Sequence, residues 1–205
     1  MARSRTSNAW LREHVNDHYV HLAKAGGWRS RAAFKLMEID DRDRLLKPGS
    51  TVVDLGAAPG GWSQLAAQRI GPQGRVFALD LLEMPPIPGV RFIQGDFREA
   101  SVLEALSNQL GTHRVDLVIS DMSPNISGVS TMDQARAMHL CELALEFAGD
   151  WLQPEGAFLV KVFQGADSEN FMRTMKMRFQ TVQSRKPKAS RDRSPEIYLL
   201  GRTLR

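Results

Sequence analysis

A strand that runs directly into a glycine-rich turn constrains the fold of this chain more than any other feature. Residues 52–62 read VVDLGAAPGGW, an apolar run that ends in Asp54 and is followed by a turn containing Gly56, Gly60 and Gly61. Glycine allows backbone conformations that other residues avoid, and it lets a ligand approach the bare main chain. The pattern predicts a strand, a tight turn and a helix, with a ligand site at the turn.

The next apolar run, RVFALD, ends in Asp80, twenty residues after Gly60. In nucleotide-binding βαβ units a carboxylate at this separation binds the hydroxyls of a ribose. The two features together predict a cofactor that contains a nucleoside. The alternative is a tight strand-to-helix turn without a ligand.

The residues of the turn narrow the choice of cofactor. They lack the second glycine of the dinucleotide pattern G-x-G-x-x-G, and they lack the G-K-[ST] of a P-loop. Asp54 beside the start of the helix offsets the positive end of the helix dipole, which suits a cationic ligand better than a phosphate. S-adenosylmethionine carries an adenosine, a sulfonium cation and an amino acid tail, and it fits this pattern.

The chain has 205 residues, enough for one domain with its own core. Its single cysteine, Cys141, lies in an apolar stretch and is expected to be a core residue. The N-terminus lacks the pattern of a signal peptide, and no apolar run reaches membrane-spanning length. We therefore expect a cytoplasmic protein without a membrane partner. As a separate expectation, which does not rest on these features, we take the protein to be a monomer.

Positive charge is concentrated in two segments of the chain. Residues 1–35 carry a net charge of +5 and residues 173–193 carry +7, whereas residues 36–172 between them carry −9. Aromatic residues are interleaved with the first basic segment: Trp10, Tyr19, Trp28 and Phe34. Basic segments with aromatic residues are typical of single-stranded nucleic acid binding, although a solvated tail would explain either segment taken singly. Two such segments on one short chain favour an RNA or DNA partner.

Hydrophobic periodicity predicts strands that alternate with helices. The expected helices are 30–46, with Ser30 as a candidate cap, 61–70, 99–110, 132–148 and a short one between 167 and 178. The expected strands are 51–55, 75–79, 90–94, 115–120, 156–163, 179–184 and 196–201. Alternation of this kind predicts a mostly parallel sheet with helices on both faces, and the last two strands, joined without a helix, predict an antiparallel edge.

Acidic residues follow four of the expected strands: Asp54, Asp80, Asp96 and Asp121. Ligands of such sheets bind beyond the carboxyl ends of the strands. We expect Asp80 to bind the ribose hydroxyls, Asp96 the adenine amino group, and Asp121 to face the reacting centre. For each residue taken alone, a helix cap or a turn is the alternative.

Lys161 lies inside the apolar strand GAFLVKVF. A lysine in a sheet covered on both faces is costly unless it is paired or neutral, and a desolvated lysine can act as a general base. The alternative is a residue near the strand end whose side chain extends to water. Glu196 and Lys35 raise the same question more weakly.

Three histidines, His14, His18 and His21, have a spacing that would place them on one face of a helix. No carboxylate or cysteine set completes a metal site around them. We predict no metal and interpret these residues as a polar side of the helix.

Several motifs resemble one known family in matching order along the chain. They are SRAAFKL at 30–36, VVDLGAAPGGWSQ at 52–64, DMSPN at 121–125, LVKVFQG at 159–165 and SPEIYLLG at 194–201. The chain resembles the FtsJ/RrmJ (RlmE) family of ribosomal RNA methyltransferases. The resemblance implies a Rossmann-like class I S-adenosylmethionine-dependent methyltransferase with a seven-stranded sheet. It also implies transfer of a methyl group to the ribose 2′-hydroxyl of a uridine in the A loop of 23S rRNA, within the assembled 50S subunit.

The resemblance also implies functional residues. The implied catalytic set is Lys35, Asp121, Lys161 and Glu196, with Lys161 as the proton acceptor. The implied cofactor contacts are Gly60, Trp62, Asp80, Asp96 and Asp121, beside the turn residues Asp54, Gly56 and Gly61. One departure is visible, because Ser123 stands where the family has alanine.

Methyl transfer to a hydroxyl needs in-line positioning and removal of a proton. Burial and the like charge of Lys35 are expected to favour the neutral amine of Lys161, while Asp121 orients it and Glu196 completes the network.

The basic segments supply the expected RNA contacts. These are Arg29, Arg31, Lys186, Lys188, Arg191 and Arg193. We expect residues 1–29 to form a basic extension that contacts RNA and residues 30–205 to form a single methyltransferase domain.

Other functions remain open at this point. The substrate could be another RNA such as tRNA. A small-molecule or amino-group methyltransferase would keep the glycine turn but would not need the basic segments, and it would more often carry [DN]-P-P-[YF] than DMSPN. A non-catalytic RNA-binding module would keep the basic segments but would have no use for Lys161.

Overall fold

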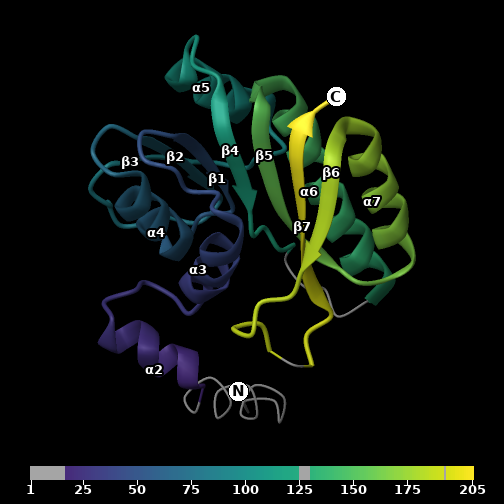
Figure 1. Ribbon diagram of the computed structural model, residues 1–205, viewed down its shortest axis with the longest axis horizontal. Helices are drawn as coiled ribbons and strands as arrows, with labels where there is room; N and C mark the ends of the chain where they lie inside the picture. The colour runs from purple at the N-terminus through teal and green to yellow at the C-terminus, as the bar shows by residue number, and fades with distance from the viewer. Residues whose placement is uncertain (1–16, 125–129, 192) are drawn as a thin grey trace, which may run out of the picture.

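The computed structural model describes residues 17–124, 130–191 and 193–205 (Figure 1). The strands are β1 (Thr51–Leu55), β2 (Arg75–Asp80), β3 (Val90–Gln94), β4 (Val115–Ser120), β5 (Leu152–Phe163), β6 (Phe179–Arg185) and β7 (Glu196–Leu204). The helices are α2 (His18–Ala25), α3 (Ala32–Asp43), α4 (Gly61–Ile70), α5 (Ala100–Leu110), α6 (Ser130–Trp151) and α7 (Ala166–Arg178). The predicted alternation of strands and helices is confirmed.

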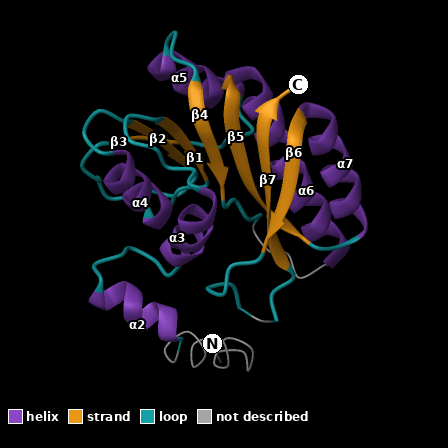
Figure 2. Ribbon diagram, viewed as in Figure 1, coloured by secondary structure: helices purple, strands orange, loops and turns teal. Residues whose placement is uncertain are grey.

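The seven strands form one sheet in the order β3-β2-β1-β4-β5-β7-β6 (Figure 2). The neighbours from β3 to β5 are parallel, and β7 is antiparallel to both β5 and β6. The predicted sheet, mostly parallel with an antiparallel C-terminal end, is therefore confirmed. In detail, β7 inserts between β5 and β6, so that β6 is the outermost strand.

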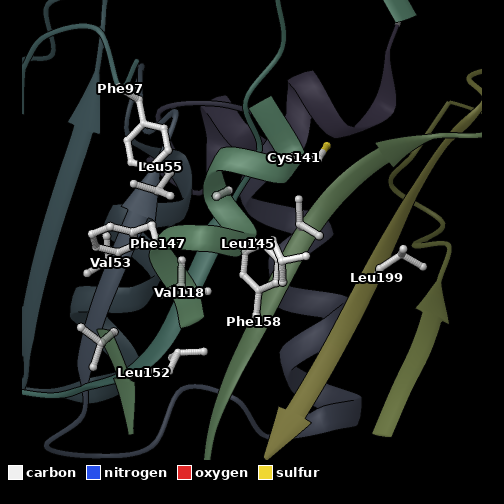
Figure 3. Packing of buried hydrophobic residues seen from close by; sticks show 14 of the residues in the cluster. Val53, Leu55, Phe97, Val118, Cys141, Leu145, Phe147, Leu152, Phe158 and Leu199 are labelled. Carbon is white, nitrogen blue, oxygen red and sulfur yellow. The ribbon is translucent and has the colours of Figure 1, made fainter. Parts of the chain in front are cut away.

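Helices cover both faces of this sheet, and each face has its own hydrophobic core. Residues of α3 and α4 pack with Val52 and Leu159 on one face. Residues of α5, α6 and α7 pack on the other, where Val53, Leu55 and Phe158 are completely buried (Figure 3). Successive strand residues point to opposite faces, so a sheet buried on both sides requires the uninterrupted apolar run seen in β1.

The start of α3 differs from the sequence prediction. Arg31 takes the N-cap position, with no side-chain cap, and the helix begins at Ala32 rather than at residue 30. Ser30, the expected cap, instead packs against the first turn of α4, where a Cβ on Gly61 would lie 2.5 Å from Ser30 Oγ. Tertiary packing thus determines the conformation of Ser30.

Candidate active site

The polar residues of the site meet at one edge of the sheet. Asp54, Asp80 and Asp121 lie at or just after the carboxyl ends of the parallel strands β1, β2 and β4. Glu196 begins the antiparallel strand β7 and pairs with Phe163 at the end of β5, so its backbone starts at the same edge. Parallel strands deliver their carboxyl ends to one side of the sheet, which is where ligands of such folds bind.

Lys161 is held inside the protein by three oxygen atoms. Its Nζ lies 2.7 Å from the backbone oxygen of Asp121, 2.6 Å from Ser123 Oγ and 3.1 Å from Asp121 Oδ1. The residue is only 7% exposed. The alternative of a lysine extending into water is therefore wrong. Three oxygen acceptors match the three N–H donors of a protonated amine.

Lys35 and Glu196 form the second charged pair of the site. Lys35 Nζ, on α3, lies 2.5 Å from Glu196 Oε1 at the start of β7. Burial raises the pKa of Glu196, but the charge and hydrogen bond of Lys35 outweigh it, so the pKa lies below its usual value. Glu196 is therefore an anion at neutral pH.

Tyr198 connects the two pairs, although it was not predicted from the sequence. Its hydroxyl donates a hydrogen bond of 3.0 Å to Asp121 Oδ1, and Lys35 Nζ lies 5.9 Å from the centre of its ring. Burial, followed by the charges of Asp121 and Glu196, raises the pKa of Tyr198 well above its usual value, so the hydroxyl remains a donor. Its position two residues after Glu196, on the same face of a strand, was the available signal.

The structure thus brings all four predicted catalytic residues, Lys35, Asp121, Lys161 and Glu196, into one cluster around Tyr198. Lys161 also pairs with Tyr198 across β5 and β7. A buried amine, an anionic partner and fixed hydrogen bonds are the groups that a proton-transfer site requires.

Asp54 lies beneath the glycine turn rather than in contact with solvent. It is completely buried, and its Oδ2 accepts a hydrogen bond of 2.6 Å from Ser63 Oγ. Burial raises the pKa of Asp54 to about 7 against the effect of that hydrogen bond, and the nearby charges of Asp121 and Asp80 raise it further. The side chain therefore supports the turn from inside.

Asp80 fixes the turn from the next strand. Its Oδ2 accepts a hydrogen bond of 2.9 Å from the backbone of Ala58, and its Oδ1 accepts one of 2.7 Å from the backbone of Leu82. Leu81 and Leu82 are 54% and 66% exposed beside it. An anchored carboxylate next to exposed apolar side chains suits the ribose and the base of a nucleoside.

Two other predicted cofactor residues have protein partners. Trp62 is buried, and its indole donates a hydrogen bond of 2.7 Å to the backbone oxygen of Ala32, so only its main chain remains for a ligand. Asp96 forms an ion pair of 2.6 Å with the exposed Arg98, whose hydrogen bonds lower the pKa of Asp96 to about 2. Asp96 is therefore an anionic acceptor at the end of β3.

The glycines of the turn allow close packing as well as an unusual backbone. Gly56 and Gly60 have φ angles of +79° and +105°. A Cβ on Gly56 would lie 2.6 Å from Met122 Cγ, and one on Gly60 would lie 2.7 Å from Ile87 Cδ1. Glycine is therefore required at these two positions by the packing of the protein as well as by the backbone conformation, and ligand approach at the turn stays a prediction.

The basic residues predicted to contact RNA mostly have partners within the protein. Arg29 donates hydrogen bonds of 2.6 and 2.7 Å to the backbone oxygens of Pro85 and Pro86. Lys186 donates to the backbone oxygens of Ser194 and Glu196, at 2.7 and 2.6 Å. These two basic residues therefore fix loops of the domain.

Arg31 and Arg191 share one acidic partner. Arg31 Nη1 lies 2.5 Å and Arg191 Nε 3.7 Å from Asp17 Oδ2. Lys188 and Arg193 are exposed. Residues 188–191 of the second basic segment thus lie against the start of α2 and against α3.

A pocket of about 490 Å³ opens beside the Lys35–Glu196 pair. It is lined by Arg31, Ala32, Lys35, Arg191, Arg193, Ser194 and Glu196. Three arginines in one pocket next to the charged cluster suit an anionic substrate.

Two of the three histidines, His18 and His21, lie on α2, whereas His14 and Trp10 fall outside the described residues. Within the described ranges, no group of three or more His, Cys, Asp or Glu side chains is arranged to hold a metal ion. None of the described helices combines the length and apolarity needed to cross a membrane.

Comparisons with known proteins agree with the geometry. The model of the FtsJ-like methyltransferase family matches residues 28–204. The chain is 69% identical over its full length to the full-length "Ribosomal RNA large subunit methyltransferase E" of Dechloromonas aromatica. It is 60% identical to the protein of the same name from Chromobacterium violaceum, over 98% of each chain.

A solved structure shares the fold. A crystal structure from Plasmodium falciparum, described as a ribosomal RNA methyltransferase, matches 86% of this chain and 98% of its own, with a TM-score of 0.78 and 29% identity. The fold and the site define a Rossmann-like methyltransferase. The chain belongs to the FtsJ-like methyltransferase family.

Proposed function

We propose that the protein transfers a methyl group from S-adenosylmethionine to the ribose 2′-hydroxyl of a uridine in the A loop of 23S rRNA, within the assembled 50S subunit. The observation that carries the proposal is the buried amine of Lys161, held by Asp121, beside a pocket that contains Lys35, Glu196 and three arginines. The relatives named as large subunit ribosomal RNA methyltransferases support RNA as the substrate. Such a substrate places the reaction in the cytoplasm.

The residues at the carboxyl ends of β1 and β2 fit S-adenosylmethionine. Asp80 offers a carboxylate for ribose hydroxyls, and the exposed Leu81 and Leu82 offer apolar contact for a base. Gly60 and Gly61 have no side chains, so the backbone at the start of α4 is available for contact with the cofactor. This cofactor supplies an electrophilic methyl group on a sulfonium.

Lys161 is the proton acceptor of the proposed reaction. As a neutral amine it keeps two of its three hydrogen bonds and has one lone pair for the ribose hydroxyl. Once it holds the proton, Asp121 and Ser123 provide acceptors for all three N–H groups. Tyr198 fixes the carboxylate of Asp121 through its hydrogen bond. The chain therefore removes a proton at a fixed position, as an in-line displacement by the ribose oxygen requires.

The basic face recognises RNA phosphates in this proposal. The residues involved are Arg29, Arg31, Lys186, Lys188, Arg191 and Arg193, aided by residues 1–29 as a basic extension of the domain formed by residues 30–205. The arginines that line the pocket lie next to the proposed catalytic set, which suits a phosphate adjacent to the reacting ribose. Removing these charges is expected to weaken RNA binding and to flatten its dependence on salt.

One experiment tests the proposal. The protein is incubated with labelled S-adenosylmethionine and either undermodified 50S subunits, naked 23S rRNA or tRNA, and the labelled ribose is mapped. We expect label on one 2′-hydroxyl in the A loop of the assembled subunit. Label on tRNA alone would show that the substrate is another RNA. Binding of the cofactor without any labelled product would contradict the proposal that the protein is a methyltransferase.

A further inference from the structure

We propose that two carboxylates, Glu38 and Asp17, are positioning residues that assemble the RNA-binding face. They do so by fastening the loop between β6 and β7 and the helix α2 onto α3. The inference rests on the proposed function, because it assigns this face to RNA. Neither carboxylate touches the reacting groups, and both act through the basic residues that they hold.

Glu38 binds the backbone of the β6–β7 loop with both of its oxygens. Its Oε2 accepts a hydrogen bond of 2.7 Å from the backbone N–H of Lys188, and its Oε1 accepts one of 2.9 Å from that of Ala189. The hydroxyl of Tyr19, on α2, lies 3.4 Å from the same Oε1. Two adjacent N–H donors require two acceptor oxygens, which an ionised carboxylate provides and an amide does not.

Arg31 completes the attachment from the N-cap position of the same helix. Its guanidinium donates a hydrogen bond to the backbone oxygen of Ala189, a completely buried residue. Arg31 and Glu38 lie on either side of Lys35 along α3, at separations that place the three on one helix face. The loop is therefore fastened directly beside a member of the proposed catalytic set.

Asp17 fastens the N-terminal segment and the loop together. Its Oδ1 accepts a hydrogen bond of 2.9 Å from the backbone of Tyr19 and so caps α2. Its Oδ2 lies 2.5 Å from Arg31 and 3.7 Å from Arg191. One carboxylate thus holds two of the arginines that line the pocket.

The fastened loop leads directly into the catalytic cluster. Lys186 closes the base of the loop by donating to the backbone oxygens of Ser194 and Glu196. Glu196 in turn pairs with Lys35. The positions of the arginines therefore depend on the same contacts that place the start of β7.

Electrostatics alone makes the opposite prediction. A negative charge on a surface that binds phosphates repels RNA, so its removal should tighten binding and steepen the salt dependence. If Glu38 and Asp17 act by positioning, their removal releases the loop and weakens RNA recognition. The sign of the effect therefore separates positioning from a simple charge effect.

The test uses the full chain, S-adenosylmethionine and undermodified 50S subunits. Glu38→Gln keeps the shape of the side chain but leaves one N–H donor facing an amide NH₂. Asp17→Asn keeps the cap of α2, since Asn caps as well as Asp, but removes the negative charge that pairs with both arginines. Glu104→Gln, on the exposed face of α5, is the matched control for charge.

For both variants we expect KM for the 50S substrate to rise about tenfold, with kcat and cofactor affinity close to wild type. In Glu38→Gln, the backbone amides of Lys188 and Ala189 should also exchange faster with solvent. Glu104→Gln should change none of these values. A KM that is unchanged or lowered in Glu38→Gln and Asp17→Asn would overturn the inference.

Failure of the inference is distinct from failure of the proposed function. If the wild type methylates the 50S subunit and both variants have the wild-type KM, only the positioning role of Glu38 and Asp17 is contradicted. If the wild type methylates no RNA, the proposed function fails. Exchange of the two loop amides can be measured in either case, and unchanged protection in Glu38→Gln would contradict the attachment itself.

Discussion

Tyr198 donates a hydrogen bond of 3.0 Å to Asp121 Oδ1, the same oxygen that lies 3.1 Å from Lys161 Nζ. A carboxylate held from two sides keeps one orientation, and the amine keeps its orientation with it. Because Tyr198 is completely buried and its pKa is raised well above its usual value, its hydroxyl remains a donor at neutral pH.

Tyr198→Phe is expected to slow methyl transfer about tenfold, because it frees the carboxylate of Asp121 without touching Lys161. The ring packing remains, so the free energy of unfolding should change by about 1 kcal/mol. Single-turnover transfer and urea unfolding measure the two effects. A rate equal to wild type would show that Asp121 needs no support from Tyr198.

Asp54→Asn should reveal the cost of a buried carboxyl group. Burial raises the pKa of Asp54 to about 7, whereas an aspartate in an unfolded chain titrates near pH ~4. Between these two pKa values the native state holds a proton that the unfolded state has released. The free energy of unfolding of the wild type therefore falls as the pH rises through this range.

The asparagine cannot ionise, so the free energy of unfolding of Asp54→Asn does not fall in this way. Relative to wild type it should rise between about pH 4 and about pH 7, by up to roughly 4 kcal/mol. Urea unfolding without cofactor at several pH values measures this difference. Asp150→Asn, at an exposed position, is the control. An advantage of Asp54→Asn that does not vary with pH would contradict the buried, protonated state.

Gly60→Ala should destabilise the protein and weaken cofactor binding. The new Cβ would meet Ile87 and Met84 at 2.7 and 2.8 Å, at a φ of +105°. Gly89→Ala is the matched control, because its φ is +79° but its Cβ would only reach Ala67 at 3.9 Å. We expect the free energy of unfolding to fall by about 1 kcal/mol in Gly89→Ala and by at least about 2 kcal/mol in Gly60→Ala. Equal losses of unfolding free energy would show that the crowding is relieved by side-chain movement.

Ser123→Ala removes one of the three oxygens around Lys161 and restores the residue expected from the family resemblance. The two oxygens of Asp121 remain, so we expect less than about a tenfold loss of transfer rate. Asp121→Asn should lower the transfer rate far more than Ser123→Ala does, because it removes the charge that stabilises the protonated amine of Lys161. Single-turnover rates of the two variants, compared with wild type, test this order. A greater loss in Ser123→Ala would make the serine essential to proton transfer.

Much of this arrangement could be predicted from the sequence because its signals are local. Periodicity placed β1 and α4 at their observed bounds. The apolar surroundings of Lys161 indicated a buried amine as one of two alternatives, and the structure selects it. The position of β7 between β5 and β6 could not be predicted in the same way, since strand order depends on pairing across the sheet.

The other features that could not be predicted from the sequence depend on contacts between residues far apart in the chain. The internal partners of the described basic residues could not be predicted, because they are distant in sequence, as Glu38 is from the backbone of Ala189. The complete burial of the Asp54 side chain could not be predicted either, because it depends on the packing of the whole sheet. The hydrogen bond from the Tyr198 hydroxyl to Asp121 joins residues 77 positions apart, so the local sequence around Tyr198 does not indicate it.

Replacement of Lys161 tests the central claim most directly. Single-turnover methyl transfer to the 50S subunit is measured for Lys161→Ala and Lys161→Met, together with calorimetric binding of S-adenosylmethionine. The methionine variant fills the buried space, so loss of activity in both variants is not a packing effect. We predict a loss of transfer of at least about 10³-fold, with cofactor affinity within about threefold of wild type. Transfer at the wild-type rate in either variant would contradict the assignment of Lys161 as the proton acceptor.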